Sequence, residues 1–216
     1  MPIQQELTAD SLIFDLDGTL WDAAETCTLA WNETFRQSEL GQHSLEADMI
    51  RSVSGLRIEK VFDQYFSFIP EERRTEVFGI YQKNEPLFMK AHGGKLFPGV
   101  RETLPALKER FRLFIVSNCL AGYIENFLEF HGLGNFFEDF ECPGKTGEPK
   151  STNIALIIER NHLNAPVYVG DTIWDYEATA ANKIPFVHAA YGFAKVPEAA
   201  YRIKQFSELK DLVYSE

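Results

Sequence analysis

Two aspartates separated by one residue, Asp15 and Asp17, follow directly on a short apolar run at residues 12–14. A short apolar run that ends at a turn signal is typical of a fully buried strand, and Gly18 allows the backbone to turn away from it. In an open α/β sheet, ligands bind just beyond the carboxyl ends of the strands. Two carboxylates there repel each other, which favours a divalent cation, and hard oxygen ligands select Mg²⁺. An acidic strand-to-turn junction without a ligand is the alternative.

Further polar residues stand at or near the ends of other predicted strands. Ser117 and Asn118 end one apolar run, and Asp171 ends another, with Asp175 one helical turn later on the same helix face. The loop at residues 144–150 carries two lysines, Lys145 and Lys150, and Lys150 stands just before a predicted helix. Taken singly, these residues have ordinary interpretations: a turn hydroxyl, a solvent-exposed lysine and an acidic pair at a helix start. Their shared position at strand ends instead indicates one site.

The elements that must position these residues follow from hydrophobic periodicity. Apolar runs predict strands, helical stripes predict helices between them, and the alternation implies right-handed βαβ units with a parallel sheet, an α/β fold. An all-helical block separates the first strand from the second, and Pro86 is expected to kink or break its last helix, since an interior proline costs ~3 kcal/mol. Asn182, before the last strand of the sheet, is a residue that can adopt a left-handed conformation. The predicted strands are 12–14, 113–118, 136–140, 167–171 and 186–188; the predicted helices are 23–35, 44–53, 58–66, 71–91, 100–110, 124–131, 152–160 (with Ser151 as N-cap), 173–181 and 206–214.

Composition excludes several classes of function. The net charge of -11 argues against binding to nucleic acid or to an anionic membrane, which both need a basic surface. No apolar run approaches the length of a membrane span, and residues 1–6 lack the features of a signal peptide. Cys27, Cys119 and Cys142 have no metal-ligand spacing and are expected to be reduced thiols. These features predict a cytoplasmic protein that is a monomer or a weak homodimer.

The four motifs resemble, in the same order, those of the haloacid dehalogenase (HAD) superfamily. They are Asp-Leu-Asp-Gly-Thr at 15–19, Phe-Ile-Val-Ser-Asn at 114–118, the lysine loop at 144–150 and Gly-Asp-Thr-Ile-Trp-Asp at 170–175. The resemblance covers nearly the whole chain. It implies a Rossmann-like core formed by residues 1–21 and 96–216, with an inserted α-helical cap domain at 22–95.

The resemblance also implies a role for each motif residue. Asp15 would be the nucleophile that accepts the phosphoryl group, and Asp17 the general acid/base. Lys150 would neutralise charge on the nucleophile and the phosphoryl group. Asp15, the backbone carbonyl of Asp17 and Asp171 would hold Mg²⁺, while Asp175 would reach the waters of the metal or orient Lys150. The predicted phosphate- and substrate-binding residues are Ser117, Asn118, Thr19 and Arg57, the last with a solvent-exposed arginine as the alternative.

The function implied is a Mg²⁺-dependent phosphatase that acts on a small phosphorylated metabolite. The chain looks most like phosphoglycolate phosphatases, so 2-phosphoglycolate is the candidate substrate. β-Phosphoglucomutase belongs to the same subfamily, and residues 22–25 and 30–31 resemble it. The mutase carries a functional histidine on its first cap helix where this chain has Cys27. A phosphomutase and a catalytically silent binding protein on the same fold therefore remain as alternatives.

Overall fold

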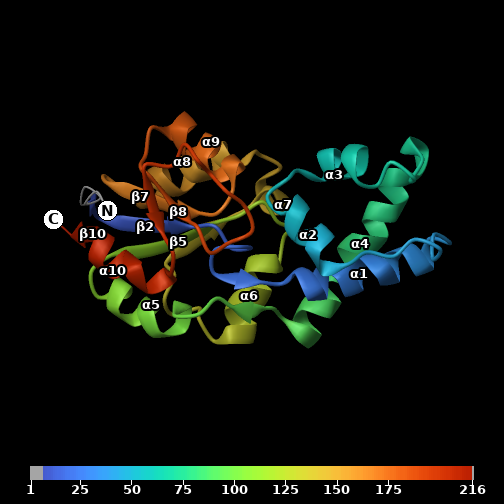
Figure 1. Cartoon of the computed structure of the whole chain (residues 1–216), viewed down its shortest axis with the longest axis horizontal. Helices are drawn as coiled ribbons and strands as arrows, with labels where there is room; N and C mark the ends of the chain where they lie inside the picture. The colour runs from blue at the N-terminus through green and yellow to red at the C-terminus, as the bar shows by residue number, and fades with distance from the viewer. Residues whose placement is uncertain (1–6, 216) are drawn as a thin grey trace.

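A computed structural model describes residues 7–215, which form two lobes (Figure 1). One lobe is built on a sheet and the other is helical. Residues 1–6, on which the expectation of no signal peptide rests, lie outside this described range. Within it, no helix is both long enough and apolar enough to cross a membrane.

A six-stranded parallel sheet forms the centre of the larger lobe. Strand β2 (Ser11–Phe14) lies between β5 (Arg112–Val116) and β7 (Pro166–Gly170). Beyond these lie β6 (Asp139–Glu141) on one side, and β8 (Phe186–Ala189) and β9 (Tyr201–Ile203) on the other. All the neighbouring pairs are parallel. The predicted α/β fold is confirmed, and the chain order reverses at β2, where such sheets bind ligands.

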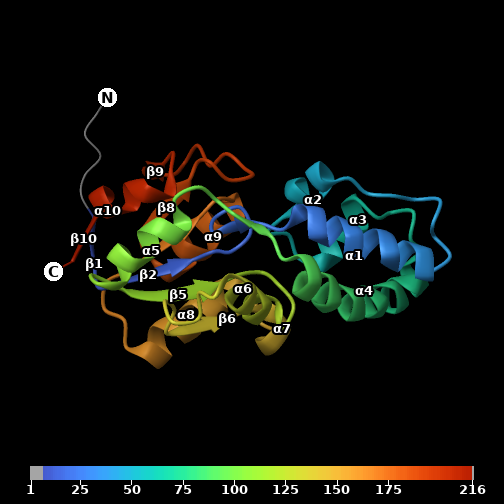
Figure 2. The same cartoon turned by 90° about the horizontal axis from the view of Figure 1, so that it is seen from below.

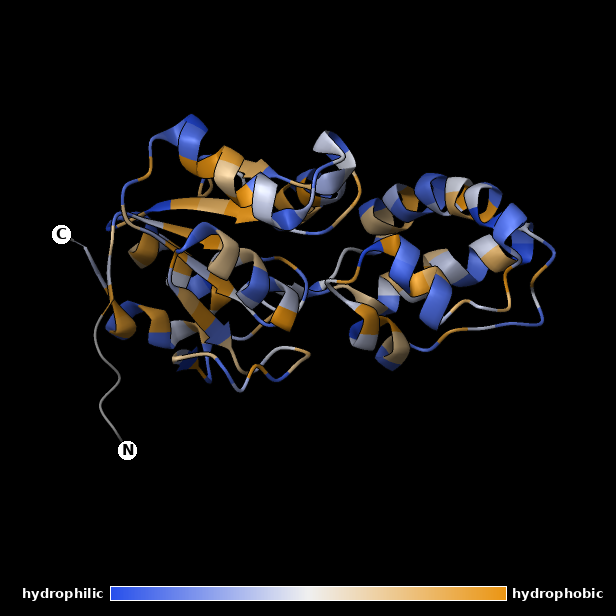
Figure 3. Cartoon of the chain, turned by 90° about the horizontal axis from the view of Figure 1, so that it is seen from above, coloured by the Kyte–Doolittle hydropathy of each residue, from blue (hydrophilic) through white to orange (hydrophobic). Residues whose placement is uncertain are grey.

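Helices cover both faces of the sheet because successive strand residues point to opposite sides. Leu12 and Phe14 of β2 pack with α5 (Val100–Lys108) and α6 (Tyr123–His131). Ile13 belongs to a second cluster with α8 (Lys150–Asn161) and α9 (Ile173–Asn182). In Figure 3 the apolar strands accordingly lie between helices whose outer faces carry polar residues. This double burial explains why the strands read as continuous apolar runs.

The helical lobe is inserted where two short strands pair. β3 (Trp21–Asp22) leaves the larger lobe and β4 (Lys95–Leu96) returns to it, as an antiparallel pair. Between them lie α1 (Ala24–Gln37), α2 (Ala47–Val53), α3 (Ile58–Gln64) and α4 (Glu71–His92). Figure 2 shows these helices gathered as a separate lobe. This arrangement supports the predicted cap at residues 22–95, whose boundaries stay a prediction.

The helical lobe has an aromatic core of its own. The rings of Trp31 and Tyr81 stack with their centroids 3.9 Å apart, which ties α1 to α4. Phe35, Phe62 and Phe66 belong to the same buried cluster, and Phe88 is partly buried against it. Stacked and edge-on aromatic pairs each add roughly 0.5–1.5 kcal/mol beyond the burial of their area.

The structure differs from the predicted helices in three details. Helix α4 runs unbroken past Pro86, which costs it only the bond from residue 86 to the carbonyl of Gln82. Helix α8 begins at Lys150, so Pro149 occupies the N-cap position predicted for Ser151. At the end of α9, Lys183 rather than Asn182 takes the left-handed conformation, with φ of 56°.

The C-terminal segment also differs from the predicted helix at 206–214. It forms a 3₁₀ turn η1 (Phe206–Glu208), the single-turn helix α10 (Leu209–Leu212) and strand β10 (Val213–Ser215). Strand β10 pairs in parallel with β1 (Leu7–Ala9), which the periodicity also misses. A segment of three residues is too short to show a repeat, and pairing with a distant strand decides its conformation.

Candidate active site

The first aspartate pair lies where β2 ends at the centre of the sheet. The Asp15 N–H extends the β2–β7 ladder by donating to the Val169 carbonyl at 2.9 Å. The chain then curls, with Leu20 N–H bonded to the Leu16 carbonyl at 2.8 Å and Gly18 at φ of 83°. Because β5 and β7 flank β2, the residues that follow all three strands meet at one edge.

Lys150 reaches this edge from the first turn of α8. Its Nζ lies 2.8 Å from Oδ1 of Asp15 and 2.6 Å from Oδ1 of Asp175. All three side chains are buried. Burial by itself would lower the pKa of Lys150, but the two carboxylates outweigh it and hold the pKa above its usual value. The ammonium group therefore stays charged, fixed beside the proposed nucleophile.

Asp175 is held by a capping box at the start of α9. Its Oδ2 accepts from both the backbone N–H of Thr172 at 2.9 Å and the Thr172 hydroxyl at 2.7 Å. Its Oδ1 accepts from Lys150 and from the Tyr168 hydroxyl at 3.3 Å. With both oxygens engaged in this way, the geometry favours Asp175 as the residue that orients Lys150.

Carboxylate oxygens of Asp15, Asp171 and Asp175 all lie within 4.8 Å of one another. Asp171 Oδ2 accepts from the Phe193 N–H at 2.8 Å, whereas Oδ1 is buried with no hydrogen-bond partner within residues 7–215. Burial, and then the charges of its carboxylate neighbours, raise the pKa of Asp171 above its usual value. A divalent cation would satisfy the unpartnered oxygen and balance the charge, so these residues fit the Mg²⁺ site that the sequence predicts.

Glycine is required on both sides of Asp171. A Cβ at Gly18 or at Gly192 would overlap the Asp171 side chain, and at Gly18 the positive φ adds backbone strain. The loop after β2 and the loop after β8 are thereby brought against the same carboxylate. This close approach explains the glycine in the first motif.

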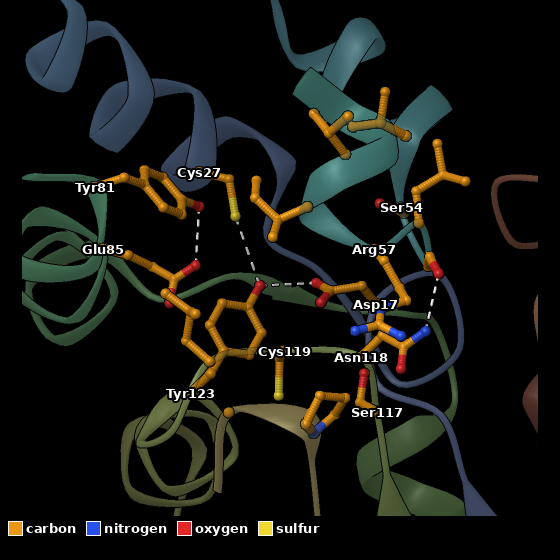
Figure 4. Close-up of a pocket in the computed structure, with 18 of the residues that line it drawn as sticks. Asp17, Cys27, Ser54, Arg57, Tyr81, Glu85, Ser117, Asn118, Cys119 and Tyr123 are labelled. Carbon is orange, nitrogen blue, oxygen red and sulfur yellow. Dashed lines mark hydrogen bonds between the residues drawn. The ribbon is translucent and has the colours of Figure 1, made fainter. Parts of the chain in front are cut away.

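Asp17, two residues after Asp15, points toward the hydroxyl of Tyr123 (Figure 4). The Tyr123 hydroxyl donates to Asp17 Oδ1 at 2.9 Å, and Cys27 Sγ lies 3.6 Å from the same hydroxyl oxygen. Burial, and next the charge of Asp15, raise the pKa of Asp17 to about 8. Burial also raises the pKa of Asp15, and the opposing charge of Lys150 limits that rise to about 6. Of the two carboxyl groups, Asp17 is the one that keeps a proton more readily.

A cavity of about 450 Å³ opens in front of these residues, between the two lobes. Asp15, Asp17 and Ser117 line it from the sheet lobe. Helices α1 to α4 supply most of the opposite wall, which is mainly apolar. The volume suits a small organic ligand.

The predicted substrate-binding residues are placed unequally. Asn118 Nδ2 donates to the Gly55 carbonyl at 3.0 Å, so it joins the two lobes at the cavity wall. Arg57 lines the cavity but is exposed, with Nε 3.5 Å from Glu59 Oε2. Thr19 is fully buried outside the cavity lining, so its predicted phosphate contact finds no support in this geometry.

Sequence reasoning missed Tyr123, Tyr81 and Glu85. Tyr123 belongs to none of the four motifs, and only the fold brings its hydroxyl within hydrogen-bond distance of Asp17. Glu85 had a detectable signal, because it lies one helical turn after Tyr81 on the stripe of α4 that also carries buried Met89. A carboxylate on a buried helix face is rare unless it is paired, and it marks a position with a function.

A known protein family has a sequence model that matches this chain. The family model described as "Haloacid dehalogenase-like hydrolase" matches residues 12–189, which include every motif above. The chain belongs to this family. The predicted family is confirmed, and with it the prediction of an enzyme of the hydrolase class.

Similar proteins carry phosphatase names. A protein of Aquifex aeolicus named "Phosphoglycolate phosphatase" is 28% identical over 190 residues, covering 86% of each chain. A "Probable phosphatase IndB" of Dickeya dadantii is 30% identical over 172 residues, covering 76% of this chain and 74% of that one. The crystal structure of a predicted phosphatase from Clostridium acetobutylicum has a TM-score of 0.80 at 22% identity, covering 94% of this chain and 97% of that one. The last of these shows the shared fold.

Proposed function

We propose that the chain is a Mg²⁺-dependent phosphatase that hydrolyses a small phosphorylated metabolite through an aspartyl-phosphate on Asp15. The observation that carries the proposal is the buried Lys150 ammonium, 2.8 Å from Asp15 Oδ1 at the cavity wall. A purely structural ion pair of this kind is often no more stable than an apolar replacement. A nucleophile that must meet a phosphate dianion, in contrast, requires fixed positive charge nearby.

In the first step, an oxygen of Asp15 attacks phosphorus and the bond from phosphorus to the leaving alcohol breaks. Asp17 gives its proton to the departing oxygen. The Tyr123 hydroxyl already donates to Asp17 Oδ1, so the proton to be transferred stands on Oδ2. Ser117 lines the cavity where it can donate to a phosphoryl oxygen.

In the second step, Asp17 removes a proton from water, which attacks phosphorus and breaks the bond to Asp15. Inorganic phosphate leaves, and Asp17 has regained the proton it gave away. Asp15, the Asp17 carbonyl and Asp171 would hold Mg²⁺, with Asp175 behind Lys150. When bound, the cation would screen the carboxylates from the negative charge of the phosphoryl oxygens.

We propose the helical block at residues 22–95 as a cap that covers the reacting groups. It supplies most of the apolar wall of the cavity, and two short strands join it to the sheet lobe. Such a wall would shield the aspartyl-phosphate from bulk water. The names of the relatives make 2-phosphoglycolate a candidate substrate. The free cysteines and acidic charge fit a cytoplasmic enzyme, monomeric or weakly dimeric, that binds neither nucleic acid nor membrane.

A phosphomutase is a weaker candidate. Cys27 stands where the mutase carries its histidine, and burial raises the pKa of the Cys27 thiol well above its usual value. A protonated thiol beside Tyr123 is a poor substitute for an imidazole that moves protons. A catalytically silent protein would have no use for the Lys150–Asp15 arrangement at the cavity wall.

Release of phosphate from p-nitrophenyl phosphate with Mg²⁺ tests the proposal. Wild type should turn over, Asp15→Asn should lose activity by about 10³-fold or more, and the exposed control Asp211→Asn should match wild type. Mass spectrometry of rapidly quenched wild type should find phosphate on Asp15. Activity retained by Asp15→Asn, or phosphate on another residue, would refute the mechanism.

A further inference from the structure

The cavity lining includes a buried carboxylate that the proposed reaction does not use. Glu85 lies on α4 and lines the cavity together with Tyr81, one helical turn earlier. Figure 4 shows both side chains across the cavity from Ser117 and Asn118, with Cys27 and Tyr123 between Glu85 and Asp17. A row of polar groups therefore leads from Asp17 inward to Glu85.

Within residues 7–215, only one of the two side-chain oxygens of Glu85 has a hydrogen-bond partner. Its side chain is 6% exposed, and Oε1 accepts from the Tyr81 hydroxyl at 2.8 Å. Across residues 7–215, no hydrogen bond or ion pair reaches its other oxygen. A carboxylate buried in this way is expected to find a partner, because an unpaired buried charge is costly.

No cation of the protein stands near enough to be that partner. Among the described residues that line the cavity, Arg57 is the only cationic side chain. It is on the other side of Asp17, exposed and close to Glu59. The lining that the cap contributes also includes Trp31, Phe66 and Phe78. No described residue of this lining therefore offers a positive charge to an ionised Glu85, and a cationic ligand would supply one.

We propose that Glu85 binds an ammonium group on the leaving alcohol, so that the preferred substrates are phosphate monoesters of small amino alcohols. This inference rests on the proposed phosphatase activity and adds the substrate class. The phosphoryl group would lie at Asp15 and Lys150, and the alcohol would extend past Asp17 toward Glu85. Hydroxyls of Tyr81 and Tyr123 would surround the ammonium end.

Two further considerations support this assignment. Burial raises the pKa of Glu85 to about 7, and an ammonium at hydrogen-bond distance would favour the carboxylate and bring that pKa down. A carboxylate on the leaving group, as in 2-phosphoglycolate, would meet Glu85 with no cation between them. The pocket therefore favours a cationic over an anionic leaving alcohol.

The test compares esters that differ only in the charged end. We would measure kcat/KM with Mg²⁺ for ω-aminoalkyl phosphates of increasing chain length, for n-alkyl phosphates with methyl in place of ammonium, and for 2-phosphoglycolate. Wild type should prefer the best aminoalkyl ester over its alkyl isostere by about tenfold or more. Glu85→Gln should abolish this preference. Glu72→Gln, an exposed position on the same helix, should behave as wild type.

Failure of the inference is distinguishable from failure of the proposed function. The wild-type ratio needs no variant: if alkyl esters or 2-phosphoglycolate match or exceed the aminoalkyl esters, the ammonium site is refuted although the phosphatase stands. If no ester is hydrolysed, p-nitrophenyl phosphate included, the phosphatase proposal fails. Calorimetric titration of ω-aminoalkyl and n-alkyl phosphonates into wild type and Glu85→Gln then decides the ammonium site by binding alone. Equal affinities would refute it.

Discussion

Lys150 Nζ lies closer to Asp175 Oδ1, at 2.6 Å, than to Oδ1 of Asp15, the proposed nucleophile, at 2.8 Å. The two carboxylates that bind the ammonium group differ in how firmly they are held. Asp175 is locked by the N-terminal capping box of α9 and so fixes where the lysine side chain ends. Asp15 bonds to Lys150 through Oδ1, so its Oδ2 is the oxygen available for the proposed attack on phosphorus. The position of the Lys150 ammonium group is thus determined by a helix that contributes no atom to the proposed reaction.

Asp175→Asn should therefore impair both stability and activity. An amide cannot pair with Lys150 as a carboxylate does, and removing one partner of a buried pair costs about 3–5 kcal/mol. Urea unfolding measures the stability, and phosphate release measures activity, which should fall about a hundredfold or more. Glu177→Gln, an exposed position on the same helix, is the control. Full activity in Asp175→Asn would show that Lys150 is positioned without it.

The unpartnered oxygen of Asp171 leads to a prediction about metal. Mg²⁺ at about 100 times its dissociation constant should stabilise wild type by about 2.7 kcal/mol against urea. Asp171→Asn should lose most of this gain. In EDTA the same variant should be no less stable than wild type, since it relieves repulsion among buried carboxylates. Sodium chloride of equal ionic strength is the control, and equal Mg²⁺ effects in both proteins would contradict the site.

Tyr123→Phe should change the protonation of Asp17 while keeping the ring. The hydroxyl stabilises the Asp17 carboxylate and acts to lower its pKa, so its loss moves that pKa upward. The limb of the pH–rate profile that reports Asp17 should shift to higher pH, and kcat should fall roughly tenfold. Tyr176→Phe, whose hydroxyl makes no hydrogen bond in the described structure, is the control. An unshifted profile would assign that limb to another group.

The strand ends of the sheet were predictable because each is a local pattern. Apolar runs that end at Asp15, Ser117 and Asp171 predict both a strand and the candidate site residue that follows it. The order of the strands in the sheet then brings those ends together. Strands β1, β9 and β10, each of three residues, could not be predicted, since their pairing with other segments of the chain decides their conformation.

The cavity wall was much less predictable. Tyr123 and Glu85 come from helices that are more than thirty residues apart in the sequence, and only lobe packing places both near Cys27. Pro86 illustrates the opposite error. Its local cost is real, but the packing of α1 against α4 outweighs the loss of a single backbone bond.

The proposed role of the cap predicts an unequal effect on two kinds of substrate. Lys60 of the cap lies with Nζ 4.2 Å from the Trp174 ring centre of the sheet lobe. Lys60→Met should remove a contact worth about 0.5–1 kcal/mol and favour opening of the cavity. Turnover of phosphorylated metabolites should then fall about two- to fivefold, with less effect on p-nitrophenyl phosphate. Lys83→Met is the exposed control, and equal losses would indicate that the helical block is only scaffold.

Glu85 should also make the stability of the protein depend on pH. Burial raises its pKa from 4.5 to about 7, so between these values the folded protein keeps a proton that the unfolded chain has released. Protonated Glu85 therefore makes its full contribution to the free energy of unfolding below about pH 4.5. This contribution declines as the pH rises to about 7, by at most on the order of 3 kcal/mol.

Urea unfolding in EDTA from pH 5 to pH 8 should detect this contribution as a difference between two proteins. Wild type loses the stability that protonated Glu85 provides as pH rises, whereas Glu85→Gln has no proton to release at this position. The free-energy difference between them should thus change with pH, and Asp15, Asp17 and Asp171, present in both, contribute little to it. Glu72→Gln should follow wild type throughout. Parallel curves for wild type and Glu85→Gln would mean that Glu85 is already ionised in the folded protein and paired with a group other than a ligand.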